Sequence, residues 1–251
     1  MFENIIEFIS HKDYVEQKED YPRPIKINIP DWYKKLEHGT LDQKRLTIKG
    51  CMPFLDTLTS GYSLQLPQDI QIQHNVWNED LKEFDSFYAV GDLFEQMIRS
   101  KGLNLNFKKA DVHGTQQLEG SPYVEKNKNL PFYKIMNPWI IKTPPGYSCL
   151  FLPPMNNSDD RFSIIPGIVD TDKFTNEINF PIIINGDKYK TLKTILKKGL
   201  PYVQIIPFKR ESWKMKISGE KTEPFVKRKL LYMTKIIHIY KDKFWSKKSW
   251  K

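Results

Sequence analysis

Residues 143–209 constrain the fold of this chain more than any other stretch. They hold three apolar blocks rich in β-branched and aromatic residues, and each is bounded by proline, glycine, asparagine or aspartate: TPPGYSCLFLPPMNN, IIPGIVDTDKFTNEINFPIIIN and ILKKGLPYVQIIPFK. Short runs of this kind between turn-forming residues are typical of β-strands. The sequence therefore predicts that residues 143–209 pair edge to edge as a compact sheet whose bends are set by proline and glycine.

A second block of strands is predicted at residues 46–76. Apolar residues recur there at every second position on both sides of a turn at residues 67–69, namely Tyr62, Leu64, Leu66, Ile70, Ile72 and, in the same series, His74. This period predicts a hairpin with one solvated face. Residues 77–130 carry a weak and polar signal, so we expect mostly exposed loop there, with strands resuming at Phe132.

The N-terminal residues differ from this β block. Residues 1–20 have weakly helical spacing, and in YPRPIKINIP three prolines fix φ and exclude a helix, which predicts an extended arm. A short helical turn should begin at Asp31, with Trp32 and Tyr33 pinning the arm to the body. We therefore divide the chain into an arm (1–45), a β domain (46–220) and a basic helical tail (221–251). The expected fold is mainly β, with a β-clip-like or sandwich-like antiparallel core.

The tail is predicted to be an amphipathic helix because its apolar residues recur at alternating spacings of four and three: Val226, Leu230, Met233, Ile237, Tyr240 and Phe244. Residues 221–251 hold ten basic and two acidic side chains, a net +8 of the total +9, so the rest of the chain is nearly neutral. The helix is expected to dock on its own domain or on a sister subunit. Nucleic-acid or membrane-surface contact is the alternative, through basic residues near aromatic ones: Lys227, Arg228, Lys229, Lys247 and Lys248.

Several classes of site have little support in the sequence. No run of about 18 apolar residues is present to span a membrane, and the N-terminus does not resemble a secretory signal. We expect a cytoplasmic protein, or a virion-associated one if it is phage-encoded. Cys51 and Cys149 are then expected to be reduced thiols. The five histidines are dispersed, so no metal site and no cofactor are predicted.

The main β block resembles the core of the dUTPase and dCTP-deaminase superfamily. The resemblance lies in the order of a Pro145-Gly146-Tyr147 turn, the Gly167-Ile168-Val169-Asp170 strand and the Gly199 to Gln204 strand. It implies a β-clip-like fold, in which Asp170 would help bind a sugar and act as a general base toward water. The alternative is that Asp170 and Asp172 hold a turn by bonding backbone N–H groups.

Two departures from that superfamily argue against nucleotide hydrolysis. Pro153-Pro154-Met155-Asn156 stands where a phosphate-binding Ser-Gly would be expected, and proline has no N–H to offer a phosphate. The glycine-rich closing arm is also absent after Gln204. A broader similarity, over TPPGY, the PP.N segment, GIVDTD and KGLPYVQIIPF, is to a bacterial and phage family catalogued only as a domain of unknown function. That similarity implies a shared β fold and no known activity.

These observations predict a binding or assembly protein with a small polar ligand pocket near Asp170, Asn156 and Gln204. His113, from the DVHGTQQ loop, could join that pocket or could be plain surface. Gln204 could instead be a polar residue of an edge strand. The first alternative is an enzyme that acts on a small nucleotide-like substrate with Asp170 as general base. The second is a virion or structural assembly protein, which could form homo-oligomers through residues 221–251.

Overall fold

The computed structural model describes residues 4–10, 15, 21–39, 47–80, 82–90, 112–219 and 239–251, with residues 223, 226, 227, 229 and 230; for residues 85 and 87–90 it describes the backbone alone. Across these ranges the protein is mainly β, and all of its paired strands are antiparallel, as predicted.

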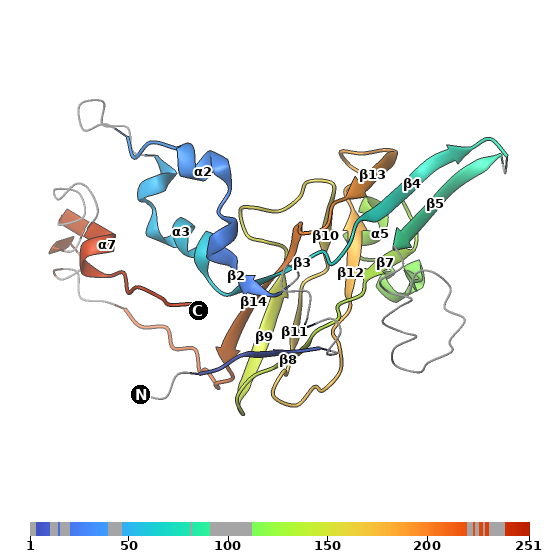
Figure 1. The fold of residues 1–251 in the computed structure, drawn as a ribbon. Coiled ribbons are helices and arrows are strands. Elements are labelled where there is room, and N and C mark those ends of the chain that lie inside the picture. The colour runs from blue at the N-terminus through green and yellow to red at the C-terminus, as the bar shows by residue number, and fades with distance from the viewer. Residues whose placement is uncertain are drawn as a thin grey trace.

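The largest sheet has five strands, and β14 (Pro201–Lys209) lies at its centre (Figure 1). On one side β14 pairs with β9 (Tyr147–Leu152), which pairs in turn with β11 (Gly167–Val169). On the other side it pairs with β3 (Tyr62–Gln65), and β2 (Arg23–Pro24) completes that edge. The register places Gln204 opposite Leu152 and Phe208 opposite Ser148, so these two pairs lie at opposite ends of the β9–β14 ladder.

Three smaller sheets surround this one in the described part of the chain. One has the order β10 (Phe162–Ile164), β12 (Phe180–Ile184), β7 (Phe132–Ile135) and β6 (Val112–His113). Another has the order β13 (Leu192–Leu196), β4 (Ile70–Asn78) and β5 (Glu83–Val90). The third pairs β1 (Glu7–Ile9) with β8 (Ile140–Lys142). In Figure 1 the β4–β5 hairpin projects from the body at the opposite side of the molecule from α7 (Ile239–Lys243).

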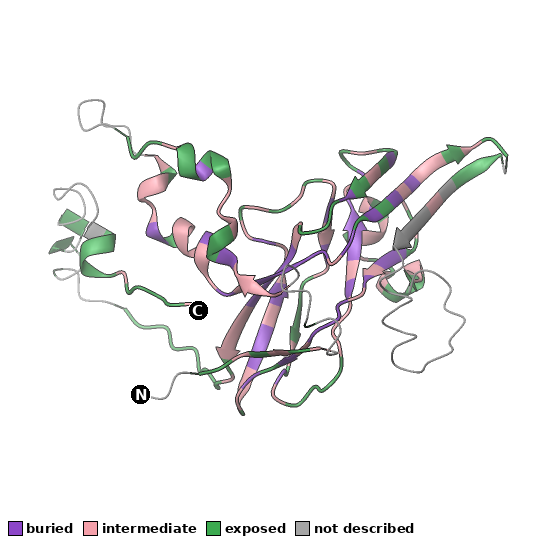
Figure 2. Ribbon diagram, viewed as in Figure 1, coloured by how far each residue is buried: buried purple, intermediate pink, exposed green. Residues whose placement is uncertain are grey.

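One hydrophobic core is shared by the sheets. Side chains from strands of all three larger sheets contribute to it, among them Leu64, Ile72, Ile135, Phe151, Ile182 and Ile205. Figure 2 shows this burial concentrated along β9, β12 and the strands beside them, while the hairpin tip and the chain after β14 are exposed. Removing this apolar surface from water is the main force that holds the sheets together.

Short helices cover one end of the five-stranded sheet. They are η2 (Ile25–Asn28), α2 (Asp31–Lys35), η3 (Ile48–Gly50) and α3 (Met52–Thr59). The predicted turn at Asp31 is confirmed as α2. Trp32 and Tyr33 both contact Phe54 of α3, and the Tyr33 ring stacks on it at 5.8 Å, so they do pin the arm to the body.

Two further short helices, η4 (Thr115–Leu118) and α5 (Pro122–Lys126), precede β7. Ser121 caps α5 by accepting a hydrogen bond from the Tyr123 backbone N–H. Over the described ranges, no helix is both long enough and apolar enough to cross a bilayer.

Two predictions about strand pairing are wrong. Residues 143–209 do form strands, but these strands are divided among three sheets instead of pairing as one. The hairpin expected across residues 67–69 does not form, because β3 pairs with β14 and β2 while β4 pairs with β13 and β5. Pro67 lacks an N–H and ends the β3 ladder, and the chain then enters a different sheet.

Three local predictions also need correction. Residues Glu7–Ile9 form a strand against β8, not part of a helix. Residues 52–59 form α3, with a proline in its first turn, inside the block predicted to be strands. The weak region after residue 77 contains β5, although residues 91–111 lie outside the described residues.

Candidate functional site

Asp170 lies at the turn that follows β11. Its backbone carbonyl accepts hydrogen bonds from the N–H groups of Lys173 (3.0 Å) and Phe174 (2.9 Å), which closes the turn. Its carboxylate accepts a hydrogen bond from the Ser148 hydroxyl at 2.7 Å and lies 3.3 Å from the Arg210 guanidinium. The side chain is half exposed. Asp170 is therefore both a turn residue and an accessible carboxylate held by two polar partners.

Asp172 ties the same turn to the Pro-Gly turn of β9. Arg210 donates to both carboxylate oxygens, at 2.8 Å and 2.5 Å, and the Gly146 backbone N–H donates at 2.8 Å. The hydrogen bond from Arg210 lowers the pKa of Asp172 to about 2, and the Gly146 N–H acts in the same direction. Gly146 has φ of 85°, a conformation that favours glycine. Asp172 thus bonds a backbone N–H that lies 26 positions away, and not a neighbouring one of its own turn as expected.

A buried polar group lies behind these carboxylates. The Thr143 and Thr171 hydroxyls hydrogen bond to each other at 2.7 Å, and Thr171 donates to the Cys149 sulfur at 3.4 Å. Burial raises the pKa of the Cys149 thiol to about 11, against the opposing effect of the Thr171 hydrogen bond. Because the thiolate is the reactive form, Cys149 is unsuited to be a nucleophile. Both cysteines are free.

Gln204 is fully buried in the central strand, so it is not the edge-strand residue considered above. Its amide oxygen accepts from the Met155 backbone N–H at 2.8 Å. Its amide nitrogen donates to the carbonyls of Thr57 (3.0 Å) and Ser60 (2.7 Å). These bonds fasten residues 153–156 and the end of α3 to β14. Gln204 is occupied by structural hydrogen bonds.

Asn156 belongs to the same end of the sheet. Its φ of 57° is left-handed, and its side-chain amide donates to the Thr57 hydroxyl at 2.7 Å. The amides of this loop are also engaged, since the Met155 N–H bonds Gln204 and the Asn157 N–H bonds the Pro154 carbonyl. The loop therefore does not present these two N–H groups to a phosphate.

The predicted pocket is not formed by these residues together. Asp170 bonds Ser148, whereas Asn156 and Gln204 lie near Leu152, four residues further along β9, a separation of about 13 Å. His113 lies on β6 in a different sheet, where its ring contacts Gln117. The structure brings Asn156 and Gln204 together and separates both Asp170 and His113 from them.

The basic tail residues predicted as candidates for nucleic-acid or membrane-surface contact differ in their surroundings. Lys227 and Lys229 are exposed helical residues, and Arg228 lies outside the described residues. Lys248 forms an ion pair with Asp56 of α3 at 2.5 Å, and Trp245 donates to the same carboxylate. Lys247 is exposed. The last residues therefore contact their own domain, one of the two expected docking partners.

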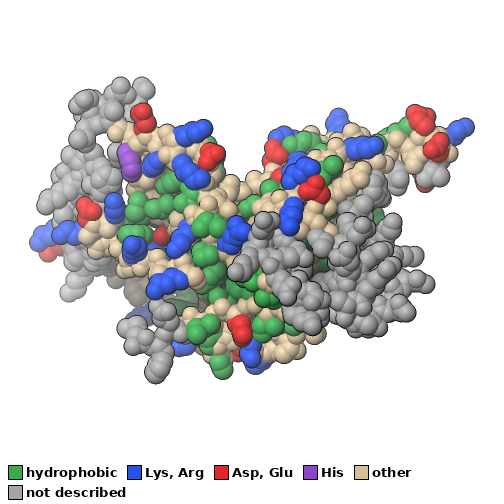
Figure 3. Space-filling view, viewed as in Figure 1, with side chains coloured by type: hydrophobic (Ala, Val, Ile, Leu, Met, Phe, Trp, Pro, Cys, Tyr) green, Lys and Arg blue, Asp and Glu red, His purple; other side chains and the backbone are tan. Residues whose placement is uncertain are grey.

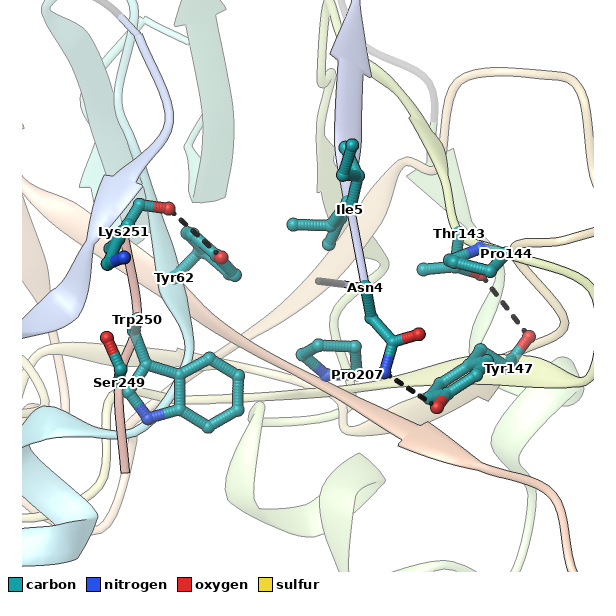
Figure 4. Close-up of a pocket in the computed structure, with 11 residues that line it drawn as sticks. Asn4, Ile5, Tyr62, Thr143, Pro144, Tyr147, Pro207, Ser249, Trp250 and Lys251 are labelled. Carbon is teal, nitrogen blue, oxygen red and sulfur yellow. Dashed lines mark hydrogen bonds between the residues drawn. The ribbon is translucent and has the colours of Figure 1, made fainter. Parts of the chain in front are cut away.

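A cavity of about 420 Å³ opens at the Pro-Gly turn that precedes β9 (Figure 4). Tyr62, Ser249, Trp250 and Lys251 lie on one side of it, and Thr143, Pro144 and Tyr147 lie on the other. Asn4 and Ile5, which precede β1, lie between these groups in the view, with Pro207 of β14 below them. The cavity is therefore an open pocket lined by the arm, the Pro-Gly turn and the last residues of the described chain.

Hydrogen bonds and ring contacts hold the walls of this cavity. Asn4 donates to the Tyr147 hydroxyl at 2.9 Å, and the Tyr62 hydroxyl donates to the Lys251 carbonyl at 3.2 Å. The Trp250 ring meets the Tyr62 ring edge to face at 6.0 Å, and Lys26 donates to the Trp250 carbonyl at 2.7 Å. Burial raises the pKa of Tyr62, so its hydroxyl is protonated at neutral pH.

Sequence reasoning missed this cavity although it singled out two of its parts. Tyr147 belongs to the TPPGY motif, and Trp250 is one of the aromatic residues near the basic side chains Lys247 and Lys248. What the sequence did not reveal is that residues near both ends of the described chain meet at Tyr62. No periodicity or motif signals such a contact.

Neither a metal site nor a known relative adds to this geometry. Within the ranges covered by the structure, no group of three or more His, Cys, Asp or Glu side chains is placed to hold a metal ion. A scan against protein-family models found no match, and a search of curated proteins found none either.

Proposed function

We propose that this protein binds a small ligand with a planar or apolar face and a few polar groups, in the cavity between Tyr62, Tyr147 and Trp250. The observation that carries this proposal is the cavity itself. Its volume of about 420 Å³ falls within the roughly 300–1,000 Å³ of ordinary small-molecule sites. Aromatic and proline rings provide flat apolar contact surface, and hydroxyl and amide groups provide the polar partners.

Tyr62 of the cavity wall is held in position before a ligand arrives. Tyr62 contacts both Trp250 and Phe8, the latter edge to face at 5.7 Å, and its hydroxyl is bonded to Lys251. Preorganised side chains lose little conformational entropy on binding, which favours affinity. This arrangement supports a binding role for the region around the TPPGY motif.

Tryptophan fluorescence and thermal shift with a panel of nucleosides and monosaccharides test the proposal. A binding compound should raise the melting temperature and change the emission of Trp250. In the Trp250→Phe variant the fluorescence response should be lost. The matched control is Trp213→Phe, which removes an exposed tryptophan outside the cavity and should leave the response unchanged. A response that is lost in the control and kept in Trp250→Phe would contradict the assignment.

A second candidate is an enzyme in which Asp170 is the general base. It is favoured by the position of Asp170, whose partner Ser148 is adjacent in sequence to the cavity residue Tyr147. Asp170→Asn keeps the shape of the side chain and removes its negative charge. For an enzyme, this variant should lose turnover while keeping its melting temperature and its binding of the compound found above.

Two finer features of the fold belong to the same proposal. The β-clip-like arrangement rests on the order of the TPPGY, GIVD and KGLPYVQ strands, which here are β9, β11 and β14 of one sheet. A continuous amphipathic helix in the tail is supported by helical residues at 223, 226, 227, 229, 230 and 239–243. The described apolar residues of its expected face, such as Val226 and Tyr240, are exposed, so any covering partner must be sought by experiment.

A further inference from the structure

The segment of residues 211–219, here named the strap, leaves β14 as an extended chain. Its large apolar side chains alternate with lysines: Trp213, Met215 and Ile217 are 88%, 84% and 87% exposed, and Lys214 and Lys216 lie between them. Alternation of apolar and polar residues is the pattern of a strand with one buried face. The strap thus has the sequence of a half-buried strand, yet no strand pairs with it within the described residues (Figure 2).

Three large apolar side chains at alternate positions of one segment, all almost completely exposed, are unusual for a protein surface. Scattered apolar residues on a surface are ordinary, but contiguous apolar patches mark sites of interaction. An extended segment with exposed apolar side chains can bury them by adding as a strand to the edge of a sheet. Main-chain hydrogen bonds then supply affinity, and alternate side chains supply specificity.

The β4–β5 hairpin has a sheet edge with matching properties. Among the described strands, β5 pairs only with β4. Trp77 and Phe84 are cross-strand partners on one face of the hairpin, with ring centroids 5.3 Å apart, and they are 46% and 58% exposed. Glu83, which precedes Phe84 in β5, lies on the opposite face, because neighbouring residues of a strand point to opposite sides.

The charges of the two surfaces are complementary. The hairpin tip carries the exposed acidic residues Glu79, Asp80 and Glu83 with the single base Lys82 (Figure 3). The strap carries two lysines and one acid, Glu211, whose charge is paired with Lys209 at 3.3 Å. If the strap lay along β5, its apolar side chains would meet the Trp77 and Phe84 face. Its lysines would then meet the Glu83 face, and opposite charges across neighbouring strands stabilise pairing.

The hairpin and the strap of one molecule are too far apart to meet. In Figure 1 the hairpin projects at one end of the molecule, and the chain that follows β14 runs along the other end toward α7. We propose that the strap of one copy adds as a strand to the β5 edge of a second copy of this chain. Because the two contacting surfaces differ, the contact can close as an antiparallel pair or a ring, or continue from copy to copy.

The test is the mass of the full-length protein in sedimentation velocity over increasing concentration. The wild-type chain should gain mass with concentration, and this gain should weaken at high salt because charges contribute to the contact. Met215→Pro removes a backbone N–H and should leave a monomer at every concentration. Its control is Met215→Val, which keeps the N–H and an apolar side chain and should assemble. Wild-type protein that stays monomeric overturns the proposal.

Mixing two defective variants identifies the surfaces involved. Phe84→Lys alters the exposed face of the β5 edge and should also be monomeric alone, with an unchanged melting temperature because the side chain lies outside the core. An equimolar mixture of Phe84→Lys and Met215→Pro retains one intact strap and one intact edge, so it should form dimers and no larger species. A mixture that stays monomeric, or that grows beyond dimers, contradicts the pairing of strap with β5.

Discussion

Acidification should destabilise this protein through His74. This residue is fully buried at the centre of β4, opposite Leu192 of β13, and neither ring nitrogen makes a hydrogen bond to the described residues. Burial lowers the pKa of His74 to about 4; the Asn127 backbone opposes this shift, and the nearby Lys128 charge adds a smaller lowering. The imidazole is therefore neutral in the folded protein well below the pH at which a free histidine is charged.

The size of this destabilisation follows from the difference between the pKa of His74 in the unfolded chain and its pKa in the folded protein. In the unfolded chain His74 has the ordinary pKa of 6.5, so between pH 6.5 and pH 4 the unfolded state binds a proton that the folded state does not. The free energy of unfolding is unaffected above this window and falls as pH decreases through it. The full loss is about 3 kcal/mol, and about 2 kcal/mol of it should have occurred at pH 5.

Urea denaturation at pH 7 and at pH 5, followed by tryptophan fluorescence, measures this loss. His74→Leu removes the titrating group without adding a buried polar atom, so its loss between these pH values should be smaller than that of the wild type by about 2 kcal/mol. His38→Gln, which replaces an exposed histidine, is the control and should behave like the wild type. Equal losses in the wild type and His74→Leu would refute the reasoning.

Three further predictions follow from single contacts. At Gly61, φ is 81° and an added Cβ would lie 2.0 Å from the Ile205 carbonyl oxygen, so Gly61→Ala should lower the free energy of unfolding by about 3 kcal/mol. The control is Gly167→Ala, where the added atom meets nothing. A change above about 0.5 kcal/mol in that control would count against the argument. Gln204→Leu should cost about 3 kcal/mol in urea denaturation because it leaves three backbone groups without their partner, and a loss below about 1 kcal/mol would show that these bonds are dispensable. Arg210→Gln should raise the pKa of the Asp172 carboxyl from about 2 toward its ordinary value in an NMR titration, and an unchanged pKa would show that Arg210 is not the cause.

The strands of residues 143–209 could be predicted because their local signals are strong. Runs of aromatic, β-branched and other apolar residues between proline and glycine determine β9, β12 and β14, and glycines with positive φ occupy the turns at Gly146 and Gly199. The partners of these strands could not be predicted, since pairing depends on contacts that are distant in sequence. β14 pairs with β3, which lies about 140 positions earlier in the chain, and no periodicity records that choice.

The same limit applies to the candidate site. Gln204 was singled out correctly as an unusual polar residue in an apolar strand. Its three hydrogen bonds, however, reach residues 49, 147 and 144 positions away, so its structural role was invisible in the sequence. Asp172 was predicted to bond neighbouring backbone groups of its own turn. The backbone N–H that it accepts belongs to Gly146, 26 positions earlier in the chain, so this bond follows from no local rule.

The construction of the cavity has a consequence for how a ligand would enter it. Two of its walls, residues 4–6 and 249–251, are short segments laid over Tyr62 and Tyr147, and few of their side chains belong to the shared core. Segments with few buried apolar contacts detach by local unfolding at far lower free energy than the sheets beneath them. Amide hydrogen exchange should therefore be fast in these segments and slow in β9 and β14, and a bound ligand should slow it at the segments first.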